Sequence, residues 1–150
     1  MPGQVVHIHV AAAGGGPMTA RSAVRAVAGS GLEGDRHFRE DGQDRPDRQV
    51  TLIEQEAVEA LGRDYGLALS PGESRRNITT RGIALNHLVG RTFRVGQALF
   101  QGVMLCEPCG HLQRMTKKKV IKGLVHRGGL RARIVEDGLV KVGDPIAETP

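Results

Sequence analysis

Residues 92–106 read Thr-Phe-Arg-Val-Gly-Gln-Ala-Leu-Phe-Gln-Gly-Val-Met-Leu-Cys, with two apolar runs on either side of a Gly-Gln pair. Short runs rich in β-branched and aromatic residues that flank a tight glycine turn are typical of a β-hairpin. We therefore predict strands over residues 92–95 and 98–106, joined at Gly96 and Gln97.

Further strands are predicted on both sides of this hairpin. Apolar and other side chains alternate in segments 5–10, 22–28 and 130–135, and segments 49–53 and 139–140 also have strand character. Alternation of this kind places one side of each strand toward a core. The chain is therefore expected to be rich in short strands.

Helical spacing is less frequent than strand alternation. Residues 54–61 have apolar side chains on one helical face after an acidic first turn, and Gly66 ends the run. A short helical piece is predicted around residues 85–88, and a longer helix after Pro108. Many short strands with few helices predict a β-rich α+β fold, a sandwich or barrel, formed by residues 1–150 as one domain.

The composition excludes several classes of protein. Hydrophobic residues make up 39% and charged residues 25% of the 150 residues, which is typical of a folded chain. Aromatic residues make up only 3%, so the core must consist mainly of Val, Leu, Ile and Ala. Base-stacking platforms for nucleic acid are then missing, and we expect no nucleic-acid partner. The net charge of +5 attracts anionic partners in general.

Targeting signals are not evident in the sequence. No apolar run approaches the roughly 18 residues of a membrane span, and the first residues do not resemble a leader peptide. We therefore expect a cytoplasmic protein without a membrane partner. Two cysteines are too few for a disulfide scaffold, so reduced thiols are expected.

Both cysteines lie in Cys106-Glu107-Pro108-Cys109-Gly110-His111, where the predicted strand gives way to the predicted helix. A thiol near a helix N-terminus is stabilised as the reactive thiolate by the helix dipole and free backbone N–H groups. We predict that Cys109 is the catalytic thiol and that Cys106, at the end of an apolar strand, is buried. A zinc site with two of the scattered histidines and a thioredoxin-type disulfide are alternatives, although neither has its usual spacing.

A polar loop over residues 31–37 is the first candidate for ligand binding. Its glycines allow close approach of the backbone to a ligand. Asp35, Arg36 and His37 then supply an acceptor, a cationic fork and a titratable ring. The competing interpretation is an Asp-Arg pair that only closes a turn.

The second candidate is the segment 71–80, which contains Arg75, Arg76, Asn77 and Thr79. Paired guanidinium groups beside amide and hydroxyl groups suit the oxygens of a phosphate or carboxylate. A solvated basic turn is the competing interpretation.

Five segments, taken in order, resemble the landmarks of the MOSC superfamily, named for the C-terminal part of molybdenum cofactor sulfurase. They are the loop 31–37, the strand 49–54, the segment 71–80, the Val95-Gly96 turn and the Glu107-Pro108-Cys109 step. Five motifs in the right order are much harder to obtain by chance than one. The likeness is to the small stand-alone bacterial type and covers roughly residues 3–147. It implies a barrel of mostly antiparallel strands with a few peripheral helices.

The resemblance also implies the molybdenum cofactor, a molybdopterin, and places the family's key cysteine at Cys109. That cysteine is expected to ligate molybdenum or to carry sulfur as a persulfide. The residues expected to bind the cofactor are Asp35, Arg36, His37, Arg75, Arg76, Asn77 and Thr79.

Three functions follow from this resemblance as expectations. The first is reduction of N-hydroxylated small molecules, with a separate electron donor. The second is sulfur transfer, with a separate cysteine desulfurase. The third is a non-catalytic cofactor or sulfur carrier, or an adaptor.

Cys106 departs from the family pattern, which often has arginine three residues before the key cysteine. The difference removes one candidate contact to an anion. It adds a thiol that resolves a Cys109 persulfide or sulfenic acid as a disulfide, provided that the two sulfurs meet.

Overall fold

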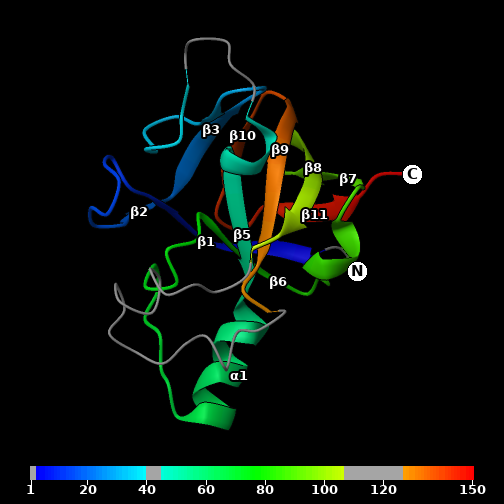
Figure 1. Ribbon diagram of the computed structural model, residues 1–150. Coiled ribbons are helices and arrows are strands. Elements are labelled where there is room, and N and C mark those ends of the chain that lie inside the picture. Colours follow the sequence, from blue (N-terminus) through cyan, green and yellow to red (C-terminus); the bar gives the residue numbers. More distant parts are fainter. Residues whose placement is uncertain (1–2, 40–44, 107–126) are drawn as a thin grey trace.

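The computed structural model describes residues 3–39, 45–106 and 127–150, which are mostly strands (Figure 1). The strands are β1 (Gly3–Val10), β2 (Thr19–Arg21), β3 (Ala23–Val27), β4 (Gly31–Leu32), β5 (Val50–Glu54), β6 (Ile78–Arg81), β7 (Thr92–Val95), β8 (Ala98–Leu105), β9 (Leu130–Glu136), β10 (Gly138–Lys141) and β11 (Pro145–Glu148). The helices are α1 (Gln55–Tyr65) and the short 3-10 helices η1 (Pro46–Arg48) and η2 (Leu85–Leu88).

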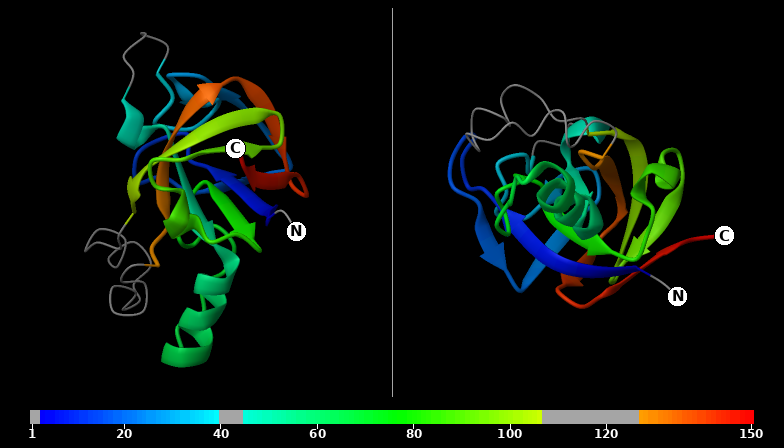
Figure 2. Two further views of the ribbon diagram at one scale, coloured as in Figure 1. Left: turned by 90° about the vertical axis from the view of Figure 1, so that its right-hand side faces the viewer. Right: turned by 90° about the horizontal axis from the view of Figure 1, so that it is seen from below.

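In the described chain, seven strands close into a barrel. Their order is β11-β7-β8-β9-β5-β6-β1, and β1 pairs back to β11 through Gly3 and Gln4. The other end of β1 pairs with β2, which therefore extends from the barrel wall. A register shift between Val5 and His7 interrupts the β1–β6 pairing, and such irregularities help strands to curve around a barrel. Figure 2 shows the ring of strands seen from below.

The barrel is mostly antiparallel, with one exception beside α1. β5 and β6 pair in parallel, and α1 lies in the connection between them. The helix begins directly after β5 and ends at Gly66, whose positive φ of 67° lets its N–H donate to the Gly62 carbonyl. α1 projects from one end of the barrel (Figures 1 and 2). A smaller antiparallel sheet, in the order β10-β3-β4, completes the described strands.

The barrel interior is packed with aliphatic side chains, as the composition predicted. Leu52, Ile78 and Ile134 are almost fully buried in this core. Phe93 and Phe100, opposite each other on β7 and β8, meet edge to face with ring centroids 5.8 Å apart. The hairpin that contains these two rings is therefore part of the central packing.

The β-rich fold class and the main strands are confirmed, including the hairpin of β7 and β8. The predicted helix over 54–61 is α1, and the piece around 85–88 is the 3-10 helix η2. β2, β4 and β11 were not predicted, and Gly31 and Leu32 of β4 had been assigned to a loop. The helix expected after Pro108 lies outside the described residues. None of the described helices has both the length and the apolar character that a membrane span requires.

Candidate functional site

Asp35 is a buried carboxylate in the loop that follows β4. Its Oδ1 accepts hydrogen bonds from the Ala11 N–H at 3.0 Å and from Asn77 Nδ2 at 3.4 Å. Its Oδ2 accepts the His37 N–H at 3.4 Å. A carboxylate without solvent contact requires such donors, and they also fix its orientation. Asp35 thus joins the loop 31–37 to the ends of β1 and β6.

Asn77 occupies the position directly before β6 and is fixed from both sides. Its Nδ2 also donates to the His9 carbonyl at 3.1 Å. Its Oδ1 accepts the Thr51 N–H at 3.0 Å and the Thr51 hydroxyl at 3.2 Å. Because all of these partners belong to the barrel wall or to Asp35, the amide is a structural link between the strands and the loop.

Arg36 follows Asp35 and keeps its guanidinium near the same carboxylate. Its Nη1 lies 4.0 Å from Asp35 Oδ1 and donates to the Met18 sulfur at 3.7 Å. Its backbone N–H donates to the Ala11 carbonyl at 2.7 Å. The side chain is 20% exposed, so part of this cation remains accessible to a ligand.

Arg75 approaches the same group of charges from the other loop. Its φ of 62° is the one positive value found among described residues other than glycine, a conformation that is costly for a side chain with a Cβ. Its Nη2 donates to the Gly16 carbonyl at 2.8 Å. Burial lowers the pKa of Arg75, the positive charge of Arg36 lowers it further, and Asp35 opposes both effects. The charges of Arg36, Arg75 and Asp35 therefore act on one another in this region.

A cavity of about 370 Å³ borders Arg75. It is lined by Met18, Arg75 and the turn of residues 70–73. The sulfur of Met18 also accepts the hydrogen bond from Arg36 Nη1. Arg75 therefore lines this cavity and Arg36 contacts its wall at Met18, and we call it the cationic cavity.

His37 is a half-buried ring at the edge of the same cluster. Burial lowers its pKa most, and the positive charges of Arg36, Arg131 and Arg48 lower it further, while Asp35 raises it. The ring is therefore neutral near pH 7 and available as a hydrogen-bonding group.

Arg76 points away from the cationic cavity. Its guanidinium is buried and donates from Nε to the Gly128 carbonyl at 2.7 Å and from Nη2 to the Cys106 carbonyl at 3.2 Å. The Cys106 N–H donates to the Gly129 carbonyl at 2.7 Å. Arg76 therefore holds the end of β8 against the start of β9, and its donors are directed at the protein's own backbone.

Thr79 lies on β6 in a different cavity, together with His7. The structure thus brings Asp35, Arg36, Arg75 and Asn77 together, with His37 beside them, but not Arg76 and Thr79.

Sequence reasoning missed three residues of this region. Thr51 is a polar side chain within a strand that was predicted, and its partner Asn77 could not be identified from spacing. Met18 gave no signal. His9 was interpreted only as the polar side of an alternating strand, yet it is 4% exposed and its carbonyl accepts the Asn77 amide.

Cys106 is a free thiol with 3% exposure, so the expectation that it is buried is confirmed. Cys109, the predicted catalytic residue and molybdenum ligand, lies outside the described residues. Within residues 3–39, 45–106 and 127–150, no three His, Cys, Asp or Glu side chains are grouped closely enough to hold a metal ion.

Comparison with known families agrees with this fold. The model of the MOSC domain matches residues 33–147, a range that includes Asp35, Asn77 and both cysteines. A search of curated proteins finds no match.

Solved structures with the same fold share little sequence with this chain. The YuaD protein from Bacillus subtilis is 16% identical, with a TM-score of 0.80 over 97% of this chain and 94% of that one. YiiM from Geobacillus stearothermophilus is 19% identical, with a TM-score of 0.75 over 99% and 76% of the two chains. YiiM from Escherichia coli is 20% identical, with a TM-score of 0.69 over 98% and 70%. At these identities the likeness supports the fold.

Proposed function

Because the chain belongs to the MOSC domain family, a family linked to the molybdenum cofactor, we propose that it binds this cofactor with its phosphate between Arg36 and Arg75. The observation that carries this proposal is that Arg75 lines the cationic cavity, while Arg36, 4.0 Å from the buried Asp35 carboxylate, contacts Met18 on the wall of the same cavity. Guanidinium groups match the oxygens of a phosphate bidentately, so Arg36 and Arg75 favour a phosphate at the cationic cavity, while the Glu73 carboxylate on the same wall opposes it.

The described residues fit the anionic part of such a cofactor. Asn77 and the Ala11 N–H hold Asp35, and Asp35 in turn lies beside Arg36. His37, as a neutral ring, adds a donor or acceptor at the rim. Asp35 and Asn77 therefore serve as positioning residues, whereas Arg36 and Arg75 make the contact with phosphate.

Cys109 is the residue that we assign to the reaction itself. It is three positions after Cys106 in the sequence, so covalent geometry limits the distance between their Cα atoms to about 11 Å. Arg76 holds the Cys106 carbonyl in a fixed position. A soft thiolate suits molybdenum and also accepts sulfur as a persulfide.

The bound cofactor would supply oxygen-atom or sulfur transfer. Reduction of an N-hydroxylated small molecule then requires electrons from a separate donor. Sulfur transfer instead requires a separate desulfurase that loads Cys109. We place either reaction in the cytoplasm, where thiols stay reduced.

Molybdenum content of the purified chain tests the proposed site. Protein made in a host that synthesises the cofactor should contain about one molybdenum per chain by elemental analysis. Arg36→Met and Arg75→Met should each lose most of this metal, because each removes a phosphate contact. Arg94→Met is the matched control, since Arg94 pairs with Glu136 on the outside of the barrel. Equal molybdenum in all four proteins would disprove the assignment.

Mass spectrometry separates the rival functions. A mass gain of one sulfur on Cys109 that is lost in Cys109→Ala but kept in Cys106→Ala supports sulfur transfer. Molybdenum without added sulfur, together with turnover of an N-hydroxylated substrate, supports the reductase. Bound cofactor without either activity identifies a carrier.

A further inference from the structure

His9 is a buried histidine of β1 that packs against the turn of residues 70–75. It is 4% exposed, and within the described chain its buried Nδ1 atom has no hydrogen-bond partner. The backbone of His9 is fixed by Asn77. The His9 N–H donates to the Asn77 carbonyl at 2.7 Å, and the His9 carbonyl accepts the Asn77 side-chain amide at 3.1 Å. The ring is therefore attached to a rigid part of the barrel wall, with one nitrogen atom unsatisfied.

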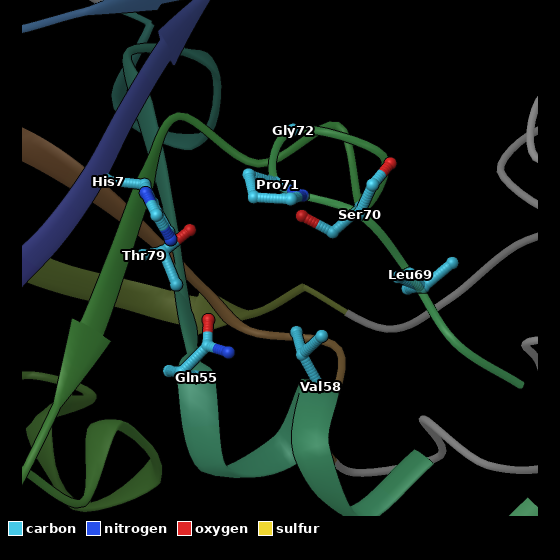
Figure 3. Close-up of a pocket in the computed structure, with 9 residues that line it drawn as sticks. His7, Gln55, Val58, Leu69, Ser70, Pro71, Gly72 and Thr79 are labelled. Atoms are coloured by element: carbon cyan, nitrogen blue, oxygen red, sulfur yellow. The ribbon is translucent and has the colours of Figure 1, made fainter. Parts of the chain in front are cut away.

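Gly72 is the residue of the turn that meets this ring. A Cβ at Gly72 would lie 2.7 Å from His9 Cδ2 and 2.9 Å from His9 Nε2, so only glycine allows this approach. Its φ of 85° also favours glycine. Figure 3 shows Ser70, Pro71 and Gly72 on the turn, beside β1 and β6. The His9 ring therefore limits how closely the turn can approach the barrel.

The same turn contains residues that line the cationic cavity. Gly72 and Arg75 both line it, and the Arg75 N–H donates to the Gly72 carbonyl at 3.0 Å. The positive φ of Arg75 is costly, so it depends on the structure around it. Arg76, the next residue, is anchored to the Gly128 and Cys106 carbonyls. A displacement of Gly72 would therefore move Arg75 before it moves Arg76.

Protonation of His9 is unfavourable in this position. Burial lowers the pKa of His9 from its ordinary value of 6.5, and the positive charge of His7, whose ring centroid is 6.1 Å away, lowers it further. No carboxylate of the described residues bonds to Nδ1. The other charged residues on the neighbouring elements are Arg21 on β2, Asp35 and Arg36 in the loop after β4, and Glu73, Arg75 and Arg76 before β6. A protonated ring would thus have a buried charge and an Nδ1–H donor without an acceptor.

A charged His9 ring would have to turn toward water, and Gly72 lies directly against it. We propose that neutral His9 positions the turn so that Arg75 meets the cofactor phosphate, and that protonation of His9 displaces the turn and weakens anion binding at the cationic cavity. His9 is thus a positioning residue and not a phosphate ligand. The inference rests on the role of Arg75 in the proposed function and adds regulation of that site by pH.

The direction of this pH effect is opposite to that of simple charge attraction. As pH falls, histidines such as His37 gain positive charge, and added positive charge near the cationic cavity strengthens anion binding. Displacement of Arg75 weakens it instead. The sign of the change therefore separates the two causes.

Calorimetric titration of the full chain with sulfate at pH 7.5 and about 5.0 tests the sign. Sulfate has the shape of phosphate and keeps its charge over this range. We expect its dissociation constant to rise about tenfold at the lower pH, as for loss of one charged hydrogen bond. His9→Gln should abolish this weakening, whereas His7→Gln, on the same strand, should keep it. Equal or tighter binding by the parent at the lower pH, or weakening that persists in His9→Gln, would overturn the proposal.

Gly72→Ala tests the contact with His9 without a change of charge. Its Cβ should push the turn away from the ring at every pH, so sulfate should bind about tenfold more weakly already at pH 7.5. Gly90→Ala is the matched control, because Gly90 has a similar φ of 79° and a Cβ there meets no atom within 4 Å. It should bind sulfate as the parent does. Equal affinity in the two glycine variants would refute the proposal, and this comparison holds even if His9→Gln does not fold.

Amide NMR of the full chain separates failure of this inference from failure of the proposed function, because it needs no anion. As pH falls, the amide signals of Gly72 and Arg75 should shift with the same midpoint as the His9 ring, and His9→Gln should abolish these shifts. If the turn follows His9 but the parent binds sulfate at neither pH, the proposed phosphate site is wrong and the link between His9 and the turn is supported. If the turn does not follow His9, the inference is wrong even where Arg75 binds sulfate.

Discussion

The buried guanidinium of Arg76 donates from Nε to the carbonyl of Gly128 at 2.7 Å. The same side chain reaches the Cys106 carbonyl at 3.2 Å, so one residue from the loop before β6 holds the end of β8 and the approach to β9. Carbonyls at such strand ends have no ladder partner, and burial without a donor would be costly. Arg76 therefore stabilises the junction between the end of β8 and the start of β9.

We expect Arg76→Met to lower the free energy of unfolding by about 2–4 kcal/mol, because charged hydrogen bonds are lost and two carbonyls remain buried. Urea unfolding followed by circular dichroism measures this change. Arg94→Met, which breaks an exposed pair with Glu136, should have almost no effect. A loss in Arg76→Met no larger than in Arg94→Met would show that the two hydrogen bonds do not stabilise the fold.

Asn77→Ala should cost about 1–3 kcal/mol of stability, because the Thr51 N–H loses its acceptor and Asp35 loses a donor. Binding of inorganic phosphate at the cationic cavity should weaken as well, since Arg36 relies on a fixed Asp35. Calorimetry measures the phosphate affinity. Gln97→Ala, at an exposed position in the turn between β7 and β8, is the control for both measurements. If Asn77→Ala binds phosphate as tightly as the parent protein does, the hydrogen bond from Asn77 to Asp35 does not position Arg36 for phosphate.

Arg75 and Arg76 illustrate a feature of the site that the sequence could not predict, namely the direction of each side chain. Both are adjacent arginines, and both were expected to contact phosphate. The positive φ of Arg75 directs the two side chains differently, so that one reaches Gly16 and the other reaches Gly128 and Cys106. Spacing does not reveal a backbone dihedral angle, and the distinction therefore required coordinates.

For the fold as well, the elements that depend on local contacts were predicted from the sequence, whereas the pairing of distant segments was not. The β7–β8 hairpin and α1 follow from local alternation, turn and cap residues, which are visible in the sequence. Closure of the barrel depends on β1 meeting β11 from opposite ends of the chain. β2 has three exposed residues and no alternation, so no pattern predicted it.

Two glycines give opposite predictions for the same substitution. A Cβ at Gly102 would lie 2.1 Å from the Leu88 carbonyl oxygen, so Gly102→Ala should cost about 1–3 kcal/mol or more, because β8 and η2 must separate. A Cβ at Gly62, inside α1, meets no atom within 4 Å, so Gly62→Ala should stabilise the protein by about 0.5–1 kcal/mol. Thermal and urea unfolding of both variants provide the comparison. Equal signs for the two changes would contradict the close packing of β8 on η2.

Stability should also fall at mildly acidic pH because of His9 and His37. Burial lowers the pKa of both rings from the ordinary value of 6.5, with His7 adding to the effect at His9 and Arg36 at His37. The unfolded chain then binds protons more readily than the folded chain. The two rings make their full contribution to the free energy of unfolding at pH values above their pKa in the unfolded chain. This contribution decreases as the pH falls from that value toward their lower pKa in the folded chain.

Urea unfolding between pH 7.5 and about 5.5 should therefore show a decreasing free energy of unfolding in the parent protein, in a range where most carboxylates remain ionised. The double variant His9→Gln, His37→Gln should have a flatter dependence, although its stability at pH 7.5 is lower through altered packing. If the double variant and the parent lose stability in parallel, other groups cause the acid sensitivity, because a slope in pH reports only groups whose proton affinity changes on unfolding.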